Sequence, residues 1–107
     1  MRILITIAPL SYRQVLMLTL RRLRPQVEVI LARPKDLDEE VERLAPELVV
    51  CNTATQRVRD GTASWVEILF QNGLGANVCV GEATSTLEEV GTEDLLRIVD
   101  ETERLAS

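Results

Sequence analysis

The side chains best suited to chemistry follow one short apolar run in the middle of the chain. Leu48-Val49-Val50 leads directly into Cys51, Asn52 and Thr53, which supply a thiol, an amide and a hydroxyl in succession. A valine-rich run that starts after a proline and stops at an asparagine is typical of a strand buried on both faces of a parallel sheet. Ligands gather at the carboxyl ends of such strands, so these three residues form the candidate site.

Cys51 is the candidate nucleophile of this group. A cysteine reacts as its thiolate, which requires a nearby cation or the amino end of a helix to lower its pKa. Arg57 and Arg59 are the nearest cations that follow it in the sequence. The alternative is that Cys51 and Cys79 are two buried free thiols, because each lies in an apolar run and the two are far apart.

The same strand end also suits the binding of a small ligand. Ser11 follows the first predicted strand, whereas Asn52 and Thr53 follow the third. Their polar side chains could converge in the crevice between these two strands and hydrogen-bond a ligand. The alternative is that all three residues have structural roles only.

Composition and charge narrow the possible functions. The chain contains no histidine, which excludes a histidine general base, a histidine-based triad and a histidine-containing zinc site. The net charge is −5, but residues 1–59 carry ten basic and seven acidic side chains, whereas residues 60–107 carry two and ten. Such an acidic second half argues against a nucleic-acid partner. We expect neither a metal ion nor an organic cofactor.

The length of the chain and its apolar runs predict a single domain, residues 1–107, with an aliphatic core. No run approaches the roughly 18 apolar residues of a membrane-spanning helix, so we expect no membrane partner. The apolar start of the chain is typical of a strand and lacks the cleavage site of a signal peptide. The predicted location is therefore the cytoplasm.

Strands and helices alternate in the first half of the chain. Apolar runs predict strands at residues 2–7, 27–31 and 48–51, and helical spacing of leucines predicts helices at residues 11–24 and 36–45. This order of elements implies parallel strands joined by right-handed crossovers.

Two of the predicted helix starts have the spacing of a capping box. Ser11 stands three residues before Gln14, and Asp36 stands three residues before Glu39. In that arrangement, each side chain satisfies a backbone donor of the other residue.

The second half departs from this alternation. The polar segment 53–63 leaves room for a loop or at most two helical turns, and residues 65–70 and 76–80 are predicted strands. Asn72-Gly73 lies between them, which predicts a tight turn and an antiparallel hairpin at one edge of the sheet. Residues 84–91 are ambiguous, and Thr92 is the predicted cap of a last helix.

The first half resembles a response-regulator receiver domain. Arg2-Ile3-Leu4-Ile5-Thr6 is similar to the first strand of that family. Pro46-Glu47-Leu48-Val49-Val50-Cys51-Asn52 is similar to its third strand, which typically reads Pro-Asp-Leu-Val-x-x-Asp and ends in the phosphoacceptor aspartate. The resemblance covers roughly residues 2–52 and the last helix. It implies a three-layer flavodoxin-like sandwich, in which a mostly parallel sheet has the order 2-1-3.

The residues that carry the chemistry of that family are replaced in this chain. Ile7 and Ala8 stand where the family has two acidic residues, and Asn52 stands where it has the phosphoacceptor. The family lysine at the end of the fifth strand corresponds to Gly81-Glu82. A helix between the third and fourth strands is also missing from the pattern. The resemblance therefore implies a degenerate receiver-like domain that lacks phosphorylation chemistry.

These observations favour a non-enzymatic regulatory or protein-interaction domain that forms a homodimer. The alternative is a small-ligand sensor or weak enzyme that uses the strand end around Cys51, Asn52 and Thr53. If the helix after the third strand is missing, Trp65 and Leu69 share an exposed face and are the candidate interface residues. The competing interpretation is that Trp65 lies over the polar segment 53–63.

Overall fold

A mixed sheet of six strands forms the centre of the molecule in the computed structural model, which describes residues 1–70 and 75–106. The strands lie in the order β2-β1-β3-β4-β5-β6. Neighbours from β2 to β4 are parallel, whereas β5 is antiparallel to β4 and β6 is antiparallel to β5. The bounds are β1 (Arg2–Ile5), β2 (Glu28–Leu31), β3 (Leu48–Cys51), β4 (Ser64–Leu69), β5 (Gly75–Val80) and β6 (Ala83–Leu87).

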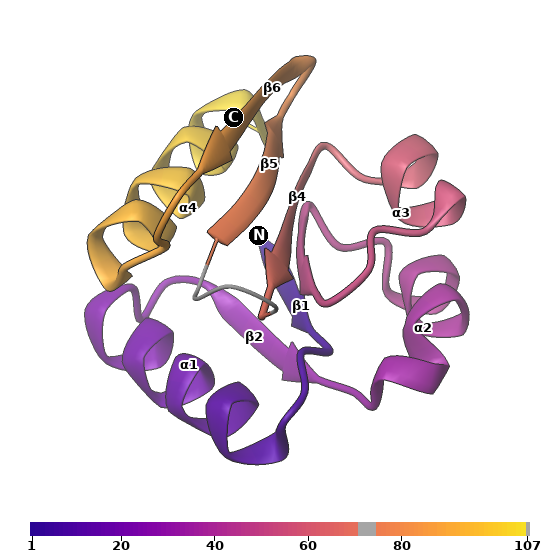
Figure 1. Cartoon of the computed structure of the whole chain (residues 1–107), viewed down its shortest axis with the longest axis horizontal. Coiled ribbons are helices and arrows are strands. Elements are labelled where there is room, and N and C mark those ends of the chain that lie inside the picture. Colours follow the sequence, from indigo (N-terminus) through magenta and orange to yellow (C-terminus); the bar gives the residue numbers. More distant parts are fainter. Residues whose placement is uncertain (71–74, 107) are drawn as a thin grey trace.

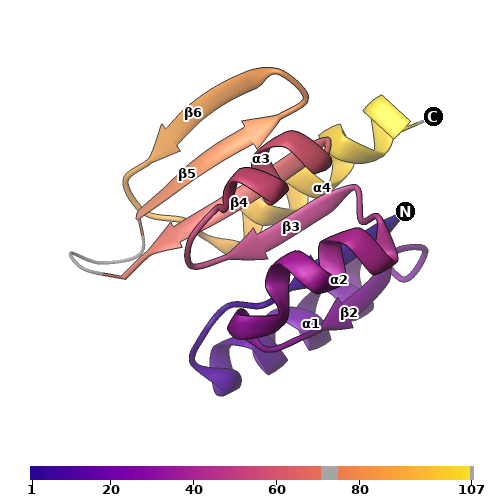
Figure 2. The same cartoon turned by 90° about the vertical axis from the view of Figure 1, so that its right-hand side faces the viewer.

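Helices cover the two faces of this sheet unequally. The helices are α1 (Leu10–Leu23), α2 (Leu37–Leu44), α3 (Gln56–Gly61) and α4 (Thr92–Ala106), with a 3-10 turn, η1 (Pro34–Asp36), before α2. Figure 1 shows α1 and α4 on one face and α2 and α3 on the other. Because α3 has only six residues, no helix in the described part of the chain covers β5 and β6 on its side of the sheet (Figure 2).

The predicted flavodoxin-like sandwich with a mostly parallel sheet is wrong. The chain is α/β, but the antiparallel strands β5 and β6 give its sheet a different topology. The connection from β4 to β5 consists of residues 70–74, and a parallel crossover needs about a dozen residues or more. The chain must therefore return antiparallel. The predicted turn at Asn72-Gly73 lies outside the described residues.

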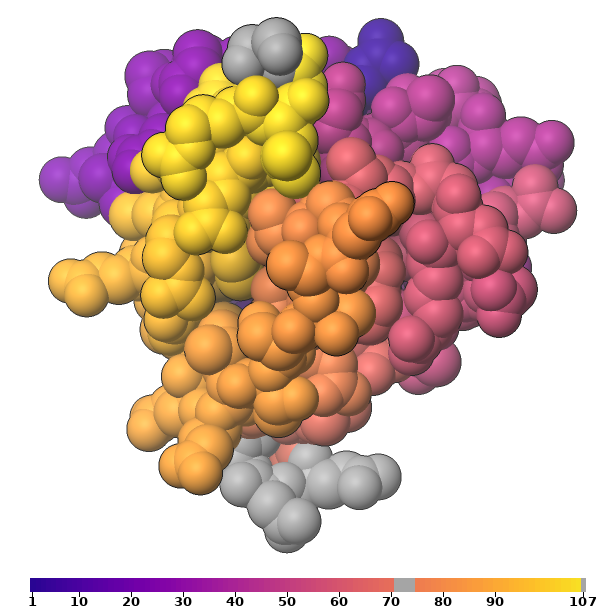
Figure 3. Space-filling view, turned by 90° about the horizontal axis from the view of Figure 1, so that it is seen from above, coloured from indigo at the N-terminus to yellow at the C-terminus, as the bar shows by residue number. Residues whose placement is uncertain are grey.

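Four of the five residues of β6 belong to the segment 84–91, whose pattern the sequence leaves ambiguous. The strand pairs with β5 along its whole length, from Val80–Ala83 to Ala76–Leu87. Seen from above in Figure 3, this part of the chain, in orange, lies at the surface between α4 in yellow and α3 in pink. Its solvent exposure explains why it lacks the apolar pattern of the inner strands.

The parallel strands separate two aliphatic layers. Ile3 and Ile5 of β1 belong to the layer beneath α1 and α4, while Leu4 belongs to the layer beneath α2 and α3. Val49 of β3 lies in that second layer with no exposed surface, as its position in the apolar run predicts. Within the described part of the chain, none of the helices has the length and apolarity needed to cross a bilayer.

The two predicted capping boxes are absent. Pro9 precedes α1 and Asp36 precedes α2, and neither helix start has a side-chain cap. The carboxylate of Asp36 instead accepts a hydrogen bond from Arg33 Nε at 2.9 Å. A side-chain cap is found at α3, where Thr55 Oγ1 accepts a hydrogen bond from the Val58 N–H. Spacing alone therefore misplaced the caps.

Candidate functional site

The predicted nucleophile, Cys51, is buried at the end of β3. Its Sγ donates a hydrogen bond to the Val66 carbonyl at 3.6 Å. Burial raises the pKa of the Cys51 thiol to about 12, and the nearby Glu67 carboxylate adds to this effect more than Arg59 opposes it. A thiol with this pKa stays protonated at neutral pH, so the site lacks the thiolate that nucleophilic chemistry requires.

We expect Cys51 to resist alkylation in the folded protein. A rise in pKa from 9.0 to about 12 lowers the thiolate fraction about 1,000-fold at pH 8, and burial blocks the reagent as well. Peptide mass spectrometry after iodoacetamide treatment should show Cys51 unmodified in buffer and fully modified in denaturant. Rapid labelling of Cys51 in the folded chain would contradict this assignment. The Cys51→Val variant, which keeps a buried apolar side chain, identifies any signal that comes from Cys79.

Asn52 ties the ends of β1 and β3 together. Its Oδ1 accepts a hydrogen bond from the Ala8 N–H at 2.8 Å, and its Nδ2 donates to the Ala8 carbonyl at 3.4 Å. The side chain at the position of the receiver phosphoacceptor therefore fixes the backbone after β1. Ile7, at one position of the missing acidic pair, is fully buried in the core.

The four predicted ligand-binding residues do not form one site. Asn52 and Thr53 line a shallow depression of about 270 Å³ together with residues 67–70, including Leu69. Ser11 is exposed on α1 and Cys51 is buried, and neither lines this depression. The structure thus brings together only two of the four residues.

A buried carboxylate that the sequence analysis did not single out organises the β4–β6 part of the sheet. Glu67 Oε2 accepts a hydrogen bond from the Ala54 N–H at 2.7 Å, and Oε1 accepts one from Asn77 Nδ2 at 3.0 Å. Asn77 Oδ1 in turn accepts a hydrogen bond from the Thr86 hydroxyl at 3.3 Å. We call these four residues the Glu67 network. It links the segment just before α3, at Ala54, to the three strands β4, β5 and β6.

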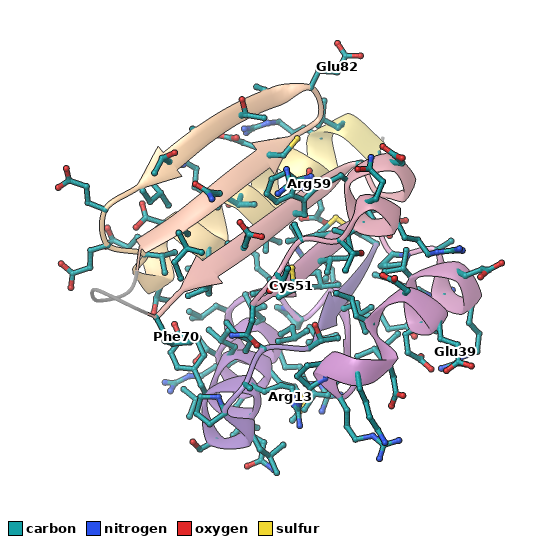
Figure 4. All side chains as sticks on the ribbon, turned by 45° about the vertical axis from the view of Figure 1, so that its right-hand side comes forward. Arg13, Glu39, Cys51, Arg59, Phe70 and Glu82 are labelled. Carbon is teal, nitrogen blue, oxygen red and sulfur yellow. The ribbon has the colours of Figure 1, made fainter. Side chains whose placement is uncertain are left out.

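Arg59 of α3 covers this network and the neighbouring tryptophan. Its Nε donates to the Ala54 carbonyl at 3.0 Å, and Nη2 lies 3.8 Å from Glu67 Oε2. The guanidinium carbon lies 4.6 Å from the centre of the Trp65 ring, within the range of a cation–π contact. Figure 4 labels Arg59 at this position, between α3 and the sheet.

The expected exposure of Trp65 is wrong. Its side chain is only 5% exposed because Arg59 and α3 lie over it. The competing interpretation, in which Trp65 lies against the segment 53–63, describes what is observed. Leu69 is 42% exposed at the end of β4, and its role as an interface residue stays a prediction.

A hollow of about 320 Å³ lies beside Arg59 on the part of the sheet that α3 leaves uncovered. Trp65, Asn77, Thr84 and Thr86 are among its lining residues. Many of its polar side chains already have partners, because Asn77 and Thr86 belong to the Glu67 network and Arg59 lies beside Glu67. Among the described residues, no group of three His, Cys, Asp or Glu side chains is placed to hold a metal ion.

The outer side of α1 departs from the usual amphipathic pattern. Leu10, Val15 and Leu18 are 52%, 59% and 62% exposed, whereas Leu16 and Leu20 of the same helix are buried. At about 100° per residue, Leu18 points about 200° away from Leu20. We call Leu10, Val15 and Leu18 the α1 outer face.

Comparisons of this chain with family models, with curated proteins and with solved structures find no match. They identify no receiver-like domain and assign no activity.

Proposed function

We propose that this chain is a non-enzymatic protein-interaction domain and that the α1 outer face is its docking surface. The observation that carries this proposal is the exposure of three large aliphatic side chains on α1, two of which, Val15 and Leu18, lie about 60° apart and point away from the buried Leu16 and Leu20. Surface leucines are common when scattered, but a group on one helix face is typical of an interaction site.

The contrast with α2 supports this interpretation. Both helices pack one side against the sheet, but α2 turns charged residues, among them Asp38, Glu39 and Glu42, toward solvent. Removing apolar surface from water contributes about 25 cal/mol per Å². Covering the α1 outer face would thus stabilise a complex, whereas covering the outer side of α2 would desolvate charges.

The charges of α1 favour a partner with an acidic rim. The helix has Arg21 and Arg22 in its last turn and contains no acidic residue. Two copies packed through this face would bring no carboxylate of α1 to meet these arginines. A different protein that borders its apolar patch with Asp or Glu satisfies both features, so this surface favours such a partner over a second copy.

The test is site-specific crosslinking in the native cell followed by quantitative binding. A photoreactive residue at position 18 should capture a partner that the same residue at position 39, exposed on α2, does not. With the purified partner, Leu18→Glu should weaken binding about tenfold or more, because it places a charge in the apolar contact. The melting temperature should not change, since Leu18 is outside the core.

Two results would contradict this function. One is equal crosslinking from positions 18 and 39, and the other is equal affinity of the wild type and Leu18→Glu for the captured protein. Arg22→Glu provides a further check, because removing this cation should lower affinity and reduce its dependence on salt.

The alternative function, a ligand sensor or weak enzyme at the β3 end, has less support. Its thiol is buried with a raised pKa, and its amide is occupied by both backbone groups of Ala8. Thr53 alone of the predicted polar groups there has an exposed side chain without a hydrogen bond among the described residues.

A further inference from the structure

The two edges of the sheet differ in how they are protected. At the β2 edge, Arg21 of α1 donates a hydrogen bond to the Val29 carbonyl at 3.2 Å, and Arg13 donates to the Ala32 carbonyl at 3.0 Å just beyond the strand. At the other edge, no side chain in the described part of the chain hydrogen-bonds the backbone of β6. An uncovered strand edge is a template for another strand.

The β5–β6 turn determines which backbone groups of β6 are free. Gly81 and Glu82 form a two-residue connection, and Gly81 has a φ of 62°, as the first position of a type II′ turn requires. Such a turn makes Val80–Ala83 a hydrogen-bonded pair. In an antiparallel ladder, hydrogen-bonded and non-hydrogen-bonded pairs alternate. Thr84 and Thr86 therefore belong to non-hydrogen-bonded pairs, and their N–H and C=O groups point away from β5.

We propose that β6 accepts an added β-strand from a partner protein, and that this strand carries Lys or Arg opposite Glu82 and Glu88. The sequence of β6 is Ala-Thr-Ser-Thr-Leu, without the proline, lysine or bulge that commonly blocks an edge. Its threonines suit strand pairing. This surface lies at the opposite edge of the sheet from β2 and α1, so the inference goes beyond the docking function proposed for α1.

The acidic residues that flank β6 specify the charge of the partner. Glu82 lies in the turn that precedes β6, Glu88 directly follows its last residue, and both are exposed, so a carboxylate flanks each end of the free edge. Figure 4 shows Glu82 projecting from the tip of the hairpin. Basic residues six positions apart in an antiparallel partner would stand opposite these two carboxylates.

The same residues argue against a second copy of this chain as the occupant. Two-fold antiparallel pairing that uses the whole of β6 is centred on Ser85, and it would bring Glu82 of each copy beside Glu88 of the other. Like charges directly opposite each other destabilise a strand pair, and this arrangement repeats the conflict at both ends. An added strand with basic residues would avoid this repulsion between carboxylates, and it would hydrogen-bond the free backbone groups of β6.

The experiment uses two synthetic peptides of matched length. The probe is fluorescein-labelled Lys-Val-Thr-Val-Thr-Val-Lys, whose lysines are spaced to meet Glu82 and Glu88, and the control replaces both lysines with glutamates. Fluorescence anisotropy with the full chain should show binding of the lysine peptide at least about tenfold tighter than that of the control. This difference should shrink at high salt.

Two variants test the mode of binding. Thr86→Pro removes one outward N–H but leaves the ladder to β5 intact, and it should weaken binding of the lysine peptide about tenfold or more. The double variant Glu82→Lys, Glu88→Lys changes only exposed side chains and should prefer the glutamate peptide. Because this second variant does not alter the backbone, it remains informative if Thr86→Pro fails to fold.

Amide chemical shifts identify where the peptide binds. Perturbations should centre on Thr84 and Thr86 and should not involve the α1 outer face. The proposal is overturned if neither peptide binds at millimolar concentration, if the charge reversal does not change the preference, or if the shifts map elsewhere. A wild-type dimer that Thr86→Pro disrupts would show that a second copy is the occupant and would overturn the proposed partner.

Discussion

Val49→Asp is expected to leave the chain largely unfolded or insoluble. Val49 has no exposed surface and lies opposite Leu4 of β1 and Trp65 of β4, with α2 and α3 packed over its layer. An unpaired carboxylate there costs several kcal/mol, against a typical total stability of about 5–15 kcal/mol. Yield of soluble protein, circular dichroism and thermal melting measure the effect.

Val15→Asp is the matched control for this experiment. It makes the same chemical change on α1, at a side chain that is 59% exposed. We expect it to change the free energy of unfolding by less than about 1 kcal/mol. If Val49→Asp were soluble, with native circular dichroism and the same melting temperature as the control, the position of β3 in the sheet would be wrong.

Glu67→Leu is expected to destabilise the fold by roughly 2–4 kcal/mol, because each buried group left without a partner costs about 1–3 kcal/mol. The variant keeps a side chain of similar size but leaves the Ala54 N–H and the Asn77 amide unpaired. It also removes the carboxylate beside Arg59. Urea unfolding, followed by circular dichroism, gives the change in free energy.

Glu88→Leu provides the control, since it makes the same substitution at an exposed carboxylate. Its effect should stay within about 0.5 kcal/mol. Equal effects of the two substitutions would show that the Glu67 network contributes nothing to stability. A double-mutant cycle with Asn77→Ala then separates the Glu67–Asn77 hydrogen bond from the rest of the network.

Local periodicity predicts the first half of this fold well. The apolar runs at β1 and β3 and the leucine spacing of α1 arise from burial that repeats along the chain, so they are visible in the sequence. The overall topology depends instead on which strands pair, and local periodicity does not contain that information. The family resemblance implies a mostly parallel sheet with one antiparallel hairpin at its edge, whereas β5 and β6 are both antiparallel to their neighbours, and the five residues between β4 and β5 permit only an antiparallel return.

The candidate sites depend on contacts that no local pattern contains. Glu67 interrupts an apolar strand, which indicates an edge or a polar face, yet its partners Ala54 and Asn77 come from separate segments. The exposure of Trp65 is expected only if no helix follows the third strand, but α3 is present there, and its Arg59 side chain covers the ring. By contrast, the exposed leucines of α1 have the same residue type as its buried ones, so spacing alone does not distinguish them.

In one half of the sheet, the paired strands are far apart in the sequence. In the other half, the paired strands follow one another in the sequence. Ile3 pairs with Leu48 across two helices and a strand, whereas β4, β5 and β6 follow one another and pair in sequence. Closing a long loop costs more conformational entropy than closing a short one, so the β4–β6 meander can form early in folding. Docking of β1 against β3 must then wait for both ends of a long loop to meet. The rate at which this domain folds is therefore expected to be governed by its parallel half.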